Sequence, residues 1–171
     1  MTENKIILRK MNKEEYDMFY RLSFEHHVNE LMDEEHMTRS EAGKETESEL
    51  REMLPLGLDS ENNNLMTVRM KDSEEQIGFI WTVYEMFQGV KQSFICDFEI
   101  YEKYRRRGFA SETLKAIEEM SKEDGCEESV LFVADVNEAA KNLYEKNGYK
   151  FLREMGYGKF LKKSIGGINE H

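Results

Sequence analysis

The stretch from Phe94 to Val133 restricts the fold of this chain more than any other part of its sequence. A strand-like run of aromatic and aliphatic residues ends at Ile100, and a basic turn with a glycine follows. Apolar residues then recur at helical spacing from Ala110 to Ile117. The continuous apolar run at 130–133 is typical of a strand that is covered on both faces. Strand, helix and strand in this order predict a parallel crossover, so the chain contains an α/β unit.

The residues on either side of this unit predict further helices and strands. Asn12 is placed to cap a first helix with Glu15 at its third helical position, and a second helix starts at Thr38 or Ser40. Three consecutive strand-like runs predict an antiparallel meander, and a helix with one or two closing strands ends the chain. The predicted strands are 5–9, 65–70, 76–84, 93–100, 130–133, 149–154 and 158–161. This order predicts an α/β fold of three layers, with a mixed central sheet of about six to seven strands flanked by helices.

Length and composition indicate one folded domain. The chain has 171 residues, one proline and 39% hydrophobic residues, which is enough to bury a sizeable core. We expect the domain to span residues 1–163 and residues 164–171 to form a flexible tail. No run approaches the ~20 apolar residues of a membrane-spanning helix, and the N-terminus lacks the pattern of a signal peptide. Two cysteines are too few for a disulfide framework, so a cytoplasmic location is the simplest expectation.

The protein carries a large negative charge, and its acidic residues are unevenly distributed along the sequence. The net charge is −11, and nine acids against three bases lie between Glu30 and Met53. This charge argues against nucleic-acid and membrane partners, because both would be repelled at long range. It is compatible with a cationic substrate, and also with a surface that is acidic only for solubility.

A basic turn before the third predicted helix is typical of a phosphate site. The segment from Arg105 to Ser111 places backbone N–H groups at the positive end of a helix, and Gly108 and Ala110 allow close approach of a ligand. A Walker-type nucleotide loop is excluded because no Gly-Lys-Ser/Thr follows, and a dinucleotide fingerprint lacks two of its three glycines. The remaining alternatives are a nucleic-acid patch, which the net charge opposes, and a solvated basic turn.

A second motif, with Asn137 at the start of a predicted helix and Gly148-Tyr149 after its end, follows the apolar strand at 130–133. Together the two motifs resemble the GNAT superfamily of acyl-CoA-dependent N-acyltransferases. The phosphate-loop pattern of that family is matched by Arg105, Gly108 and Ala110, and its later helix by Asn137, Ala140, Leu143, Tyr144, Gly148 and Tyr149. The turn at 53–58 also resembles that of a bacterial subgroup, the YycN-like proteins. The resemblance implies a GNAT-type fold and acetyl-CoA as cosubstrate, with CoA as product.

The resemblance also implies which residues hold the cofactor. In the family, a bulge in the strand before the phosphate loop and a splay from the next parallel strand let the backbone pair with the pantetheine arm. In this sequence Phe98 and Ile100 occupy the matching positions of that strand, and the resemblance implies that they bind through the backbone. Ala110 departs from the commoner glycine, and two arginines stand where many members have a small residue. The expected cofactor-binding residues are Phe98, Ile100, Arg105, Arg106, Arg107, Gly108, Phe109, Ala110, Ser111, Asn137 and Ala140. Asn137 is equally well explained as a helix cap.

Three residues are candidates for proton transfer. Tyr144 occupies the position that in many family members protonates the departing thiolate; the alternative is an ordinary core aromatic. Asp97 and Glu99 are candidate bases, because in a regular strand they share one face, opposite Phe98 and Ile100. The alternative for both is an exposed or structural carboxylate. The same regular strand would place Phe94 on the face of Phe98 and Ile100.

The resulting hypothesis is an acetyl-CoA-dependent N-acetyltransferase that acts on a primary amine of a small molecule or peptide by direct attack in a ternary complex. The alternative is a non-catalytic acyl-CoA-binding module of the same fold. We expect a cationic acceptor, with at least one of Glu30, Asp33, Glu34 or Glu35 near its charged end. A homodimer is compatible with the family. No metal is expected, because the adjacent His26 and His27 point in different directions on a helix.

Overall fold

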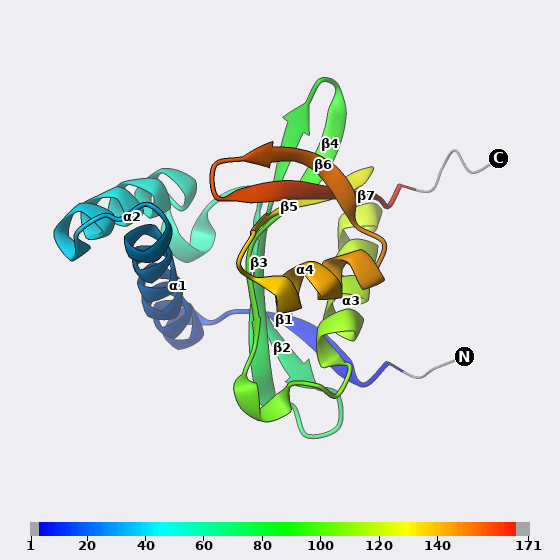
Figure 1. The fold of residues 1–171 in the computed structure, drawn as a ribbon. Helices are drawn as coiled ribbons and strands as arrows, with labels where there is room; N and C mark the ends of the chain where they lie inside the picture. Colours follow the sequence, from blue (N-terminus) through cyan, green and yellow to red (C-terminus); the bar gives the residue numbers. More distant parts are fainter. Residues whose placement is uncertain (1–3, 167–171) are drawn as a thin grey trace.

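The computed structural model describes residues 4–166, and it places seven strands in one mixed sheet (Figure 1). The strand order is β1-β2-β3-β4-β5-β7-β6. The strands are β1 (Ile6–Lys10), β2 (Asn63–Met70), β3 (Gln76–Phe87), β4 (Val90–Ile100), β5 (Glu128–Ala134), β6 (Lys150–Met155) and β7 (Gly158–Ser164). The helices are α1 (Lys13–Glu34), α2 (Arg39–Met53), α3 (Phe109–Glu123) and α4 (Glu138–Lys146), with short 3-10 turns at Gly57–Asp59 and Glu102–Tyr104. The predicted order of elements is confirmed.

One parallel pair lies inside an otherwise antiparallel sheet. β2 to β4 form the predicted meander, and β1 pairs antiparallel with β2. β4 and β5 run parallel with α3 as the crossover, and β5, β7 and β6 are antiparallel. The parallel pairing is short, because it joins only Gln92–Ile95 of β4 to Glu128–Leu131 of β5. Beyond these residues the two strands separate, and the fold therefore has an opening in the middle of its sheet.

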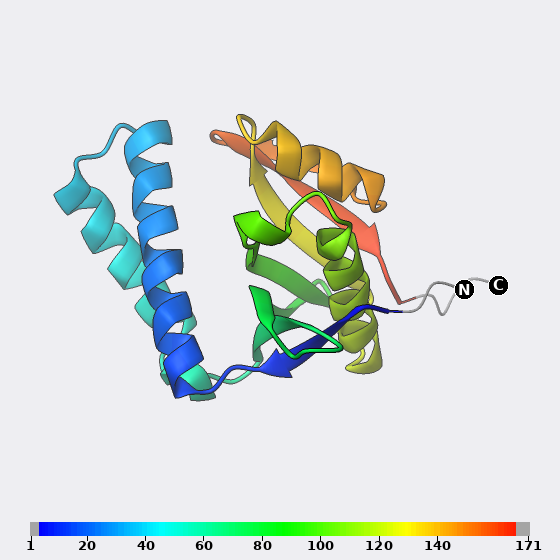
Figure 2. The ribbon, with the colours of Figure 1, turned by 90° about the horizontal axis from the view of Figure 1, so that it is seen from below.

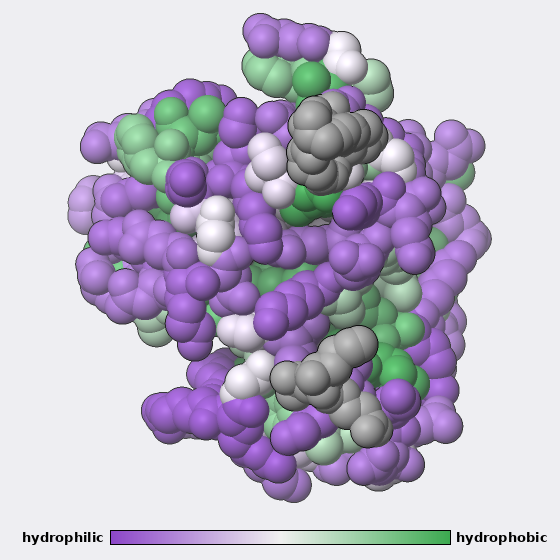
Figure 3. Space-filling model, turned by 90° about the vertical axis from the view of Figure 1, so that its right-hand side faces the viewer, coloured by the Kyte–Doolittle hydropathy of each residue, from purple (hydrophilic) through white to green (hydrophobic). Residues whose placement is uncertain are grey.

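Helices cover the two faces of the sheet separately (Figure 2). On one face, Phe19 of α1 packs edge-on against Phe79 and Trp81 of β3, at ring-centroid distances of 5.1 and 5.6 Å. On the other face, Leu114 and Ile117 of α3 belong to a buried cluster that also includes residues of α4. The three-layer arrangement expected from the sequence is confirmed. The molecular face shown in Figure 3 is mostly hydrophilic, with apolar surface in separate patches.

The starts of both N-terminal helices follow the local sequence. Asn12 and Glu15 form the predicted capping box of α1, since each side chain accepts a hydrogen bond from the backbone N–H of the other. Thr38 and Glu41 form the same box at α2, which fixes the start at Thr38 rather than Ser40. Among residues 4–166, none of the helices is long and apolar enough to cross a membrane.

The expected tail begins at residue 164, and the structure describes its first three residues, 164–166. Ser164 belongs to β7, and the N–H groups of Ile165 and Gly166 both donate to the Glu127 carbonyl, at 2.9 and 3.1 Å. Ile165 is also buried. β7 thus ends at Ser164, and backbone hydrogen bonds join the next two residues to Glu127. The rest of the expected tail, residues 167–171, lies outside the described residues.

Candidate active site

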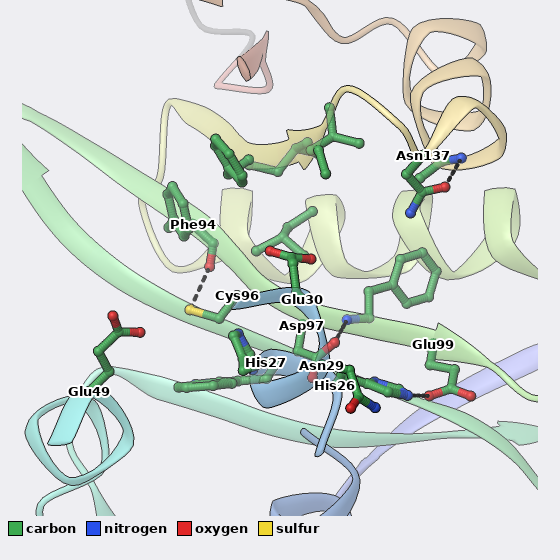
Figure 4. A pocket seen from close by; sticks show the side chains of 18 of the residues that line it. His26, His27, Asn29, Glu30, Glu49, Phe94, Cys96, Asp97, Glu99 and Asn137 are labelled. Carbon is green, nitrogen blue, oxygen red and sulfur yellow. Dashed lines mark hydrogen bonds and ion pairs between the residues drawn. The ribbon is translucent and has the colours of Figure 1, made fainter. Parts of the chain in front are cut away.

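A cavity of about 640 Å³ lies where β4 and β5 separate (Figure 4). Its walls come from the separated halves of the two strands, Cys96–Glu99 and Phe132–Ala134, and from α1, α2 and the start of α4. Because the parallel pairing ends at Ile95 and Leu131, the facing backbone edges beyond it are not bonded to each other. The cavity therefore reaches through the sheet, from the layer of α1 and α2 to α4.

A bulge in β4 determines which side chains face this cavity. Asp97 pairs with Trp81 and Ile95 with Thr82, so Cys96 between them is the extra residue. The expectation that Phe94 shares a face with Phe98 and Ile100 is therefore wrong. Phe94 lines the cavity and contacts Phe160 at 6.2 Å between ring centroids. The bulge reverses the alternation of side chains, as the resemblance to the GNAT pattern implied.

Beyond the bulge, Asp97 and Glu99 share the face expected from the sequence. They pair with Trp81 and Phe79, which face α1, whereas Phe98 and Ile100 pack into the cluster beneath α3. Both carboxylates line the cavity (Figure 4).

Each of these two carboxylates keeps one oxygen without a hydrogen bond. Asp97 Oδ1 accepts a hydrogen bond from the Phe98 N–H at 2.9 Å, while its Oδ2 is buried and has no hydrogen-bond partner among residues 4–166. The Glu99 side chain is 21% exposed and lies 3.5 Å from Arg105 Nη2 and 3.7 Å from His26 Nε2. Glu99 Oε1 likewise has no hydrogen bond within the described chain. Two buried acceptor atoms in the cavity wall thus lack a hydrogen-bond partner among the described residues.

Tyr144 of α4 is buried beside these carboxylates. It is 9% exposed, lines the cavity, and packs edge-on against Tyr149 at 5.7 Å between ring centroids. Burial and, to a lesser degree, the negative charge of Asp97 raise the pKa of Tyr144 above its ordinary value of 10.0. The phenol is therefore a neutral O–H donor at neutral pH. No hydrogen bond joins its hydroxyl to another of the described residues.

The segment from Arg105 to Ser111 has the geometry of an anion site. Arg106 and Gly108 adopt left-handed backbone conformations, with φ of 61° and 82°, and Gly108 caps the N-terminus of α3. None of the backbone N–H groups from Arg106 to Ser111 has a hydrogen-bond partner within the described chain. A Cβ at Gly108 would have no atom within 4 Å, so the space above these amides is open. The residues fit a diphosphate, which accepts several such bonds.

The three arginines of this segment make different contacts. Arg105 Nε donates to the Ile100 carbonyl at 2.7 Å, and its guanidinium faces Glu99, so this side chain braces the end of β4. Arg107 lies over the ring of Phe109 at 5.1 Å. Arg106 is exposed.

Asn137 begins α4 and serves as its cap. Its Oδ1 accepts a hydrogen bond from the Ala140 N–H at 3.1 Å, and both residues also line the cavity. The cap interpretation is therefore present in the structure, and it leaves the Asn137 amide nitrogen free to contact a ligand.

Several cavity residues were not expected from the sequence. Tyr157 donates a hydrogen bond to Glu30 Oε2 at 2.6 Å, which links the β6–β7 turn to α1. Burial and this bond raise the pKa of Tyr157, so it remains a donor. Glu49 lines the cavity from α2, and partial burial and the neighbouring Glu45 raise its pKa. Of the four acids expected near an acceptor, Glu30 lines the cavity, whereas Asp33, Glu34 and Glu35 do not.

The described residues contain no group of three or more His, Cys, Asp or Glu side chains placed to hold a metal ion. Cys96 is part-buried in the cavity wall, and burial raises the pKa of its thiol. Cys126 is buried elsewhere. Neither thiol has the lowered pKa that favours a nucleophile.

Comparison with known proteins gives consistent matches. The sequence model of the Acetyltransferase (GNAT) family matches residues 25–149. The uncharacterised N-acetyltransferase YdgE of Bacillus subtilis is 31% identical over 142 residues, which are 83% of this chain and 90% of that protein. The uncharacterised N-acetyltransferase YycN of the same organism is 26% identical over 145 residues, 85% of this chain and 92% of YycN.

Solved structures show the same fold. The crystal structure of YycN superposes with a TM-score of 0.81 at 25% identity, over 88% of this chain and 95% of YycN. A spermidine N-acetyltransferase from Vibrio cholerae, solved with CoA and spermine, has a TM-score of 0.67 at 16% identity, over 95% of this chain and 97% of that one. At that level of identity the second likeness concerns the fold alone.

Proposed function

The chain belongs to the GNAT family of acetyltransferases, and from this premise we propose that its cavity is where an acetyl group passes from acetyl-CoA to a cationic primary amine. As a member of this family it is an N-acetyltransferase, for which acetyl-CoA is the usual cosubstrate. The observation that carries the proposal is the convergence of one buried phenol and two carboxylates on a single cavity, next to a row of free amides. Acetyl-CoA supplies the acyl group in activated form, as a thioester.

The amides from Arg106 to Ser111 hold the diphosphate of the cofactor in this proposal. They lie at the positive end of α3, where an anion is favoured. The unpaired backbone edges of β4 and β5 extend from this end of the sheet into the cavity, where they donate and accept hydrogen bonds along the pantetheine arm. Phe98 and Ile100 contribute through the backbone, since their side chains pack in the core. The Phe98 N–H and the Ile100 carbonyl already have partners, Asp97 Oδ1 and Arg105 Nε, so other backbone groups of this edge bind the arm.

Tyr144 acts as the general acid. Its neutral phenol is available to protonate the thiolate as the thioester C–S bond breaks, and no other described residue competes for that proton by hydrogen bonding. The acid role requires only that the sulfur lie within hydrogen-bond reach of the hydroxyl, on the cavity side of α4.

Asp97 and Glu99 receive the proton that the amine must lose. Each presents one oxygen without a hydrogen-bond partner to the same cavity. A carboxylate at this position first binds the protonated amine and then accepts a proton, either directly or through a water molecule. Arg105 Nη2 lies 3.5 Å from Glu99 Oε2 and His26 Nε2 lies 3.7 Å from Glu99 Oε1, so both groups help to orient this carboxylate.

Transfer proceeds directly from the thioester to the amine. The alternative route through an acetylated Cys96 is disfavoured, because burial raises the pKa of this thiol and so removes the reactive thiolate. No base within the described chain hydrogen bonds to its sulfur, which donates to the Phe94 carbonyl at 3.8 Å.

The charge of the cavity supports a cationic acceptor. Its lining residues include four carboxylates, from Glu30, Glu49, Asp97 and Glu99, and one guanidinium, from Arg105. A concave site lined with one sign of charge raises the local concentration of ligands with the opposite sign.

A thiol-release assay with acetyl-CoA and a panel of cationic, neutral and anionic primary amines tests this function. We expect one or more cationic amines to give the highest kcat/KM, with the acetamide product identified by mass spectrometry. The value should fall as salt shortens the Debye length from about 10 Å at 0.1 M to about 3 Å at 1 M. Release of no CoA above hydrolysis with any amine would refute the function, and a neutral or anionic best acceptor would refute its cationic part.

A further inference from the structure

The cavity has a second acidic end, remote from the phenol and the phosphate turn. Figure 4 shows Glu49 of α2 at one end and Glu99 toward the other, with His27, Cys96 and Asp97 between them. Glu30 of α1 lines the same cavity. Neither Glu30 nor Glu49 forms an ion pair with a lysine or arginine among residues 4–166. Their charges are therefore free to bind a cation that comes from outside the chain.

A buried hydroxyl next to Glu49 points to a ligand at this end. Thr46 lies three residues before Glu49, on the same side of α2, and it also lines the cavity. Its side chain is 1% exposed, yet its Oγ1 has no hydrogen-bond partner within the described chain. Because an unpaired buried hydroxyl is unfavourable, a ligand that donates a hydrogen bond to it would be bound more tightly.

The neighbouring groups on α1 also present hydrogen-bond acceptors. His27 Nδ1 lies 2.8 Å from the Ser23 carbonyl, which can only accept, so Nδ1 is the donor of this bond and Nε2 is the ring nitrogen left to contact a ligand. Tyr157 donates to one oxygen of Glu30, which fixes the carboxylate and leaves its other oxygen available. An ammonium group, with three donors, matches such a set of acceptors.

The wall between the two acidic ends is apolar. It is formed by the rings of Trp81 and Phe94 and by the side chain of Cys96. The Trp81 N–H is already bonded to Asn63 Oδ1 at 2.7 Å, so this residue adds no free donor to the wall. An alkyl spacer fits such a surface, and the aromatic faces also attract nearby cations.

We propose that the acceptor is a diamine or polyamine with two cationic nitrogens joined by an alkyl spacer. One nitrogen lies at Asp97 and Glu99, where it is acetylated, and the second binds to Glu49 and Thr46. This inference rests on the proposed function and specifies the substrate class of the same site. Glu49 and Thr46 then determine acceptor specificity and take no part in proton transfer.

Paired series of acceptors test the proposal. The kcat/KM values of α,ω-diaminoalkanes of increasing length are compared with those of n-alkylamines of equal length, in the thiol-release assay. We expect the diamine to be the better substrate over a limited range of lengths, because only those lengths reach both ends. Calorimetry with the same amines and the enzyme–CoA complex measures binding without turnover.

Glu49→Gln removes the charge and Thr46→Val removes the hydroxyl while keeping the shape of the side chain. Glu49→Gln should raise KM for the best diamine about fivefold, the size of effect expected of an exposed charge contact, and raise KM for the monoamine clearly less. Thr46→Val should raise KM for the diamine by a similar factor, through the loss of one hydrogen bond, and both variants should keep kcat. Glu47→Gln is the matched control, since Glu47 lies on the same helix, is exposed, pairs with Arg51 and does not line this cavity.

Four results would overturn the inference. Monoamines that equal diamines at every length, or a Glu49→Gln change that affects both series alike, contradict a second cation site. An unchanged KM in Thr46→Val together with a more stable protein contradicts a role of the hydroxyl in binding. Release of no CoA from any amine refutes the proposed function itself, and the inference with it.

Discussion

Substitution of glutamate for each of two matched glycines, one at the proposed phosphate site and one elsewhere, tests that site. Gly108 and Gly89 both have φ of 82°, and a Cβ at either would have nothing within 4 Å. They differ in place, because Gly108 caps α3 beside the free amides, while Gly89 lies in the turn between β3 and β4. Gly108→Glu and Gly89→Glu therefore introduce the same strain and the same charge, but only the first places that charge at the proposed diphosphate site.

The expected changes in Tm follow from the backbone conformation of the two glycines and from the binding of acetyl-CoA. A non-glycine residue in the left-handed conformation costs roughly 1–2 kcal/mol, so both variants should melt about 2–8 °C below the parent protein. Acetyl-CoA at about a hundred times its Kd stabilises the parent by about 2.7 kcal/mol, which raises Tm by roughly 5–11 °C. Gly89→Glu should keep this rise, and Gly108→Glu should lose it.

Differential scanning fluorimetry with and without acetyl-CoA measures the shift, and calorimetry measures the affinity directly. Gly108→Ala serves as the milder change if the glutamate variant does not fold. If Gly108→Glu and Gly89→Glu showed equal shifts with acetyl-CoA, the amides of α3 would not be the diphosphate site.

The remaining predictions concern proton transfer and the thiol. Tyr144→Phe keeps the ring contact with Tyr149 and removes a hydroxyl that has no hydrogen-bond partner among the described residues. The value of kcat should fall roughly 10²–10⁴-fold, while Kd for CoA stays nearly unchanged. An unchanged kcat, with chemistry shown to be rate-limiting, would make Tyr144 an ordinary core aromatic. Because the pKa of Tyr144 is raised above 10.0, its phenol stays protonated as pH rises, and the kcat profile should show no loss from this group below pH 10. A Tyr144→Phe profile that loses an alkaline limb present in the parent below pH 10 would contradict this. Cys96→Ala should keep more than half of kcat, and initial-rate plots against both substrates should intersect; parallel lines with an inactive Cys96→Ala would indicate an acetyl-cysteine.

Features that depend on local sequence could be predicted for this chain. The capping boxes at Asn12 and Thr38 use residues three positions apart, and the turn before α3 is defined by Gly108 and the arginines around it. The strand–helix–strand unit gave the parallel pair and hence the layers. The placement of Asp97 and Glu99 on one face followed from simple alternation within a few residues of β4.

Features that depend on pairing between distant segments could not be predicted. The resemblance implied a bulge in β4, but its position at Cys96 is defined only relative to β3, so alternation along β4 alone placed Phe94 on the wrong face. Tyr157 and Glu30 are 127 residues apart, and nothing in either local sequence indicates their hydrogen bond. Glu49 lies in a helix so rich in acids that the pattern does not distinguish the one facing the cavity.

A crystal structure of the protein with CoA tests the central claim most directly. We predict that the diphosphate accepts hydrogen bonds from the amides between Arg106 and Ser111, that the pantetheine arm lies between the separated ends of β4 and β5, and that the sulfur lies within hydrogen-bond distance of the Tyr144 hydroxyl, facing Asp97. A CoA bound elsewhere, or one whose sulfur lies away from Tyr144 and the two carboxylates, would contradict the claim that this cavity is where acetyl transfer takes place.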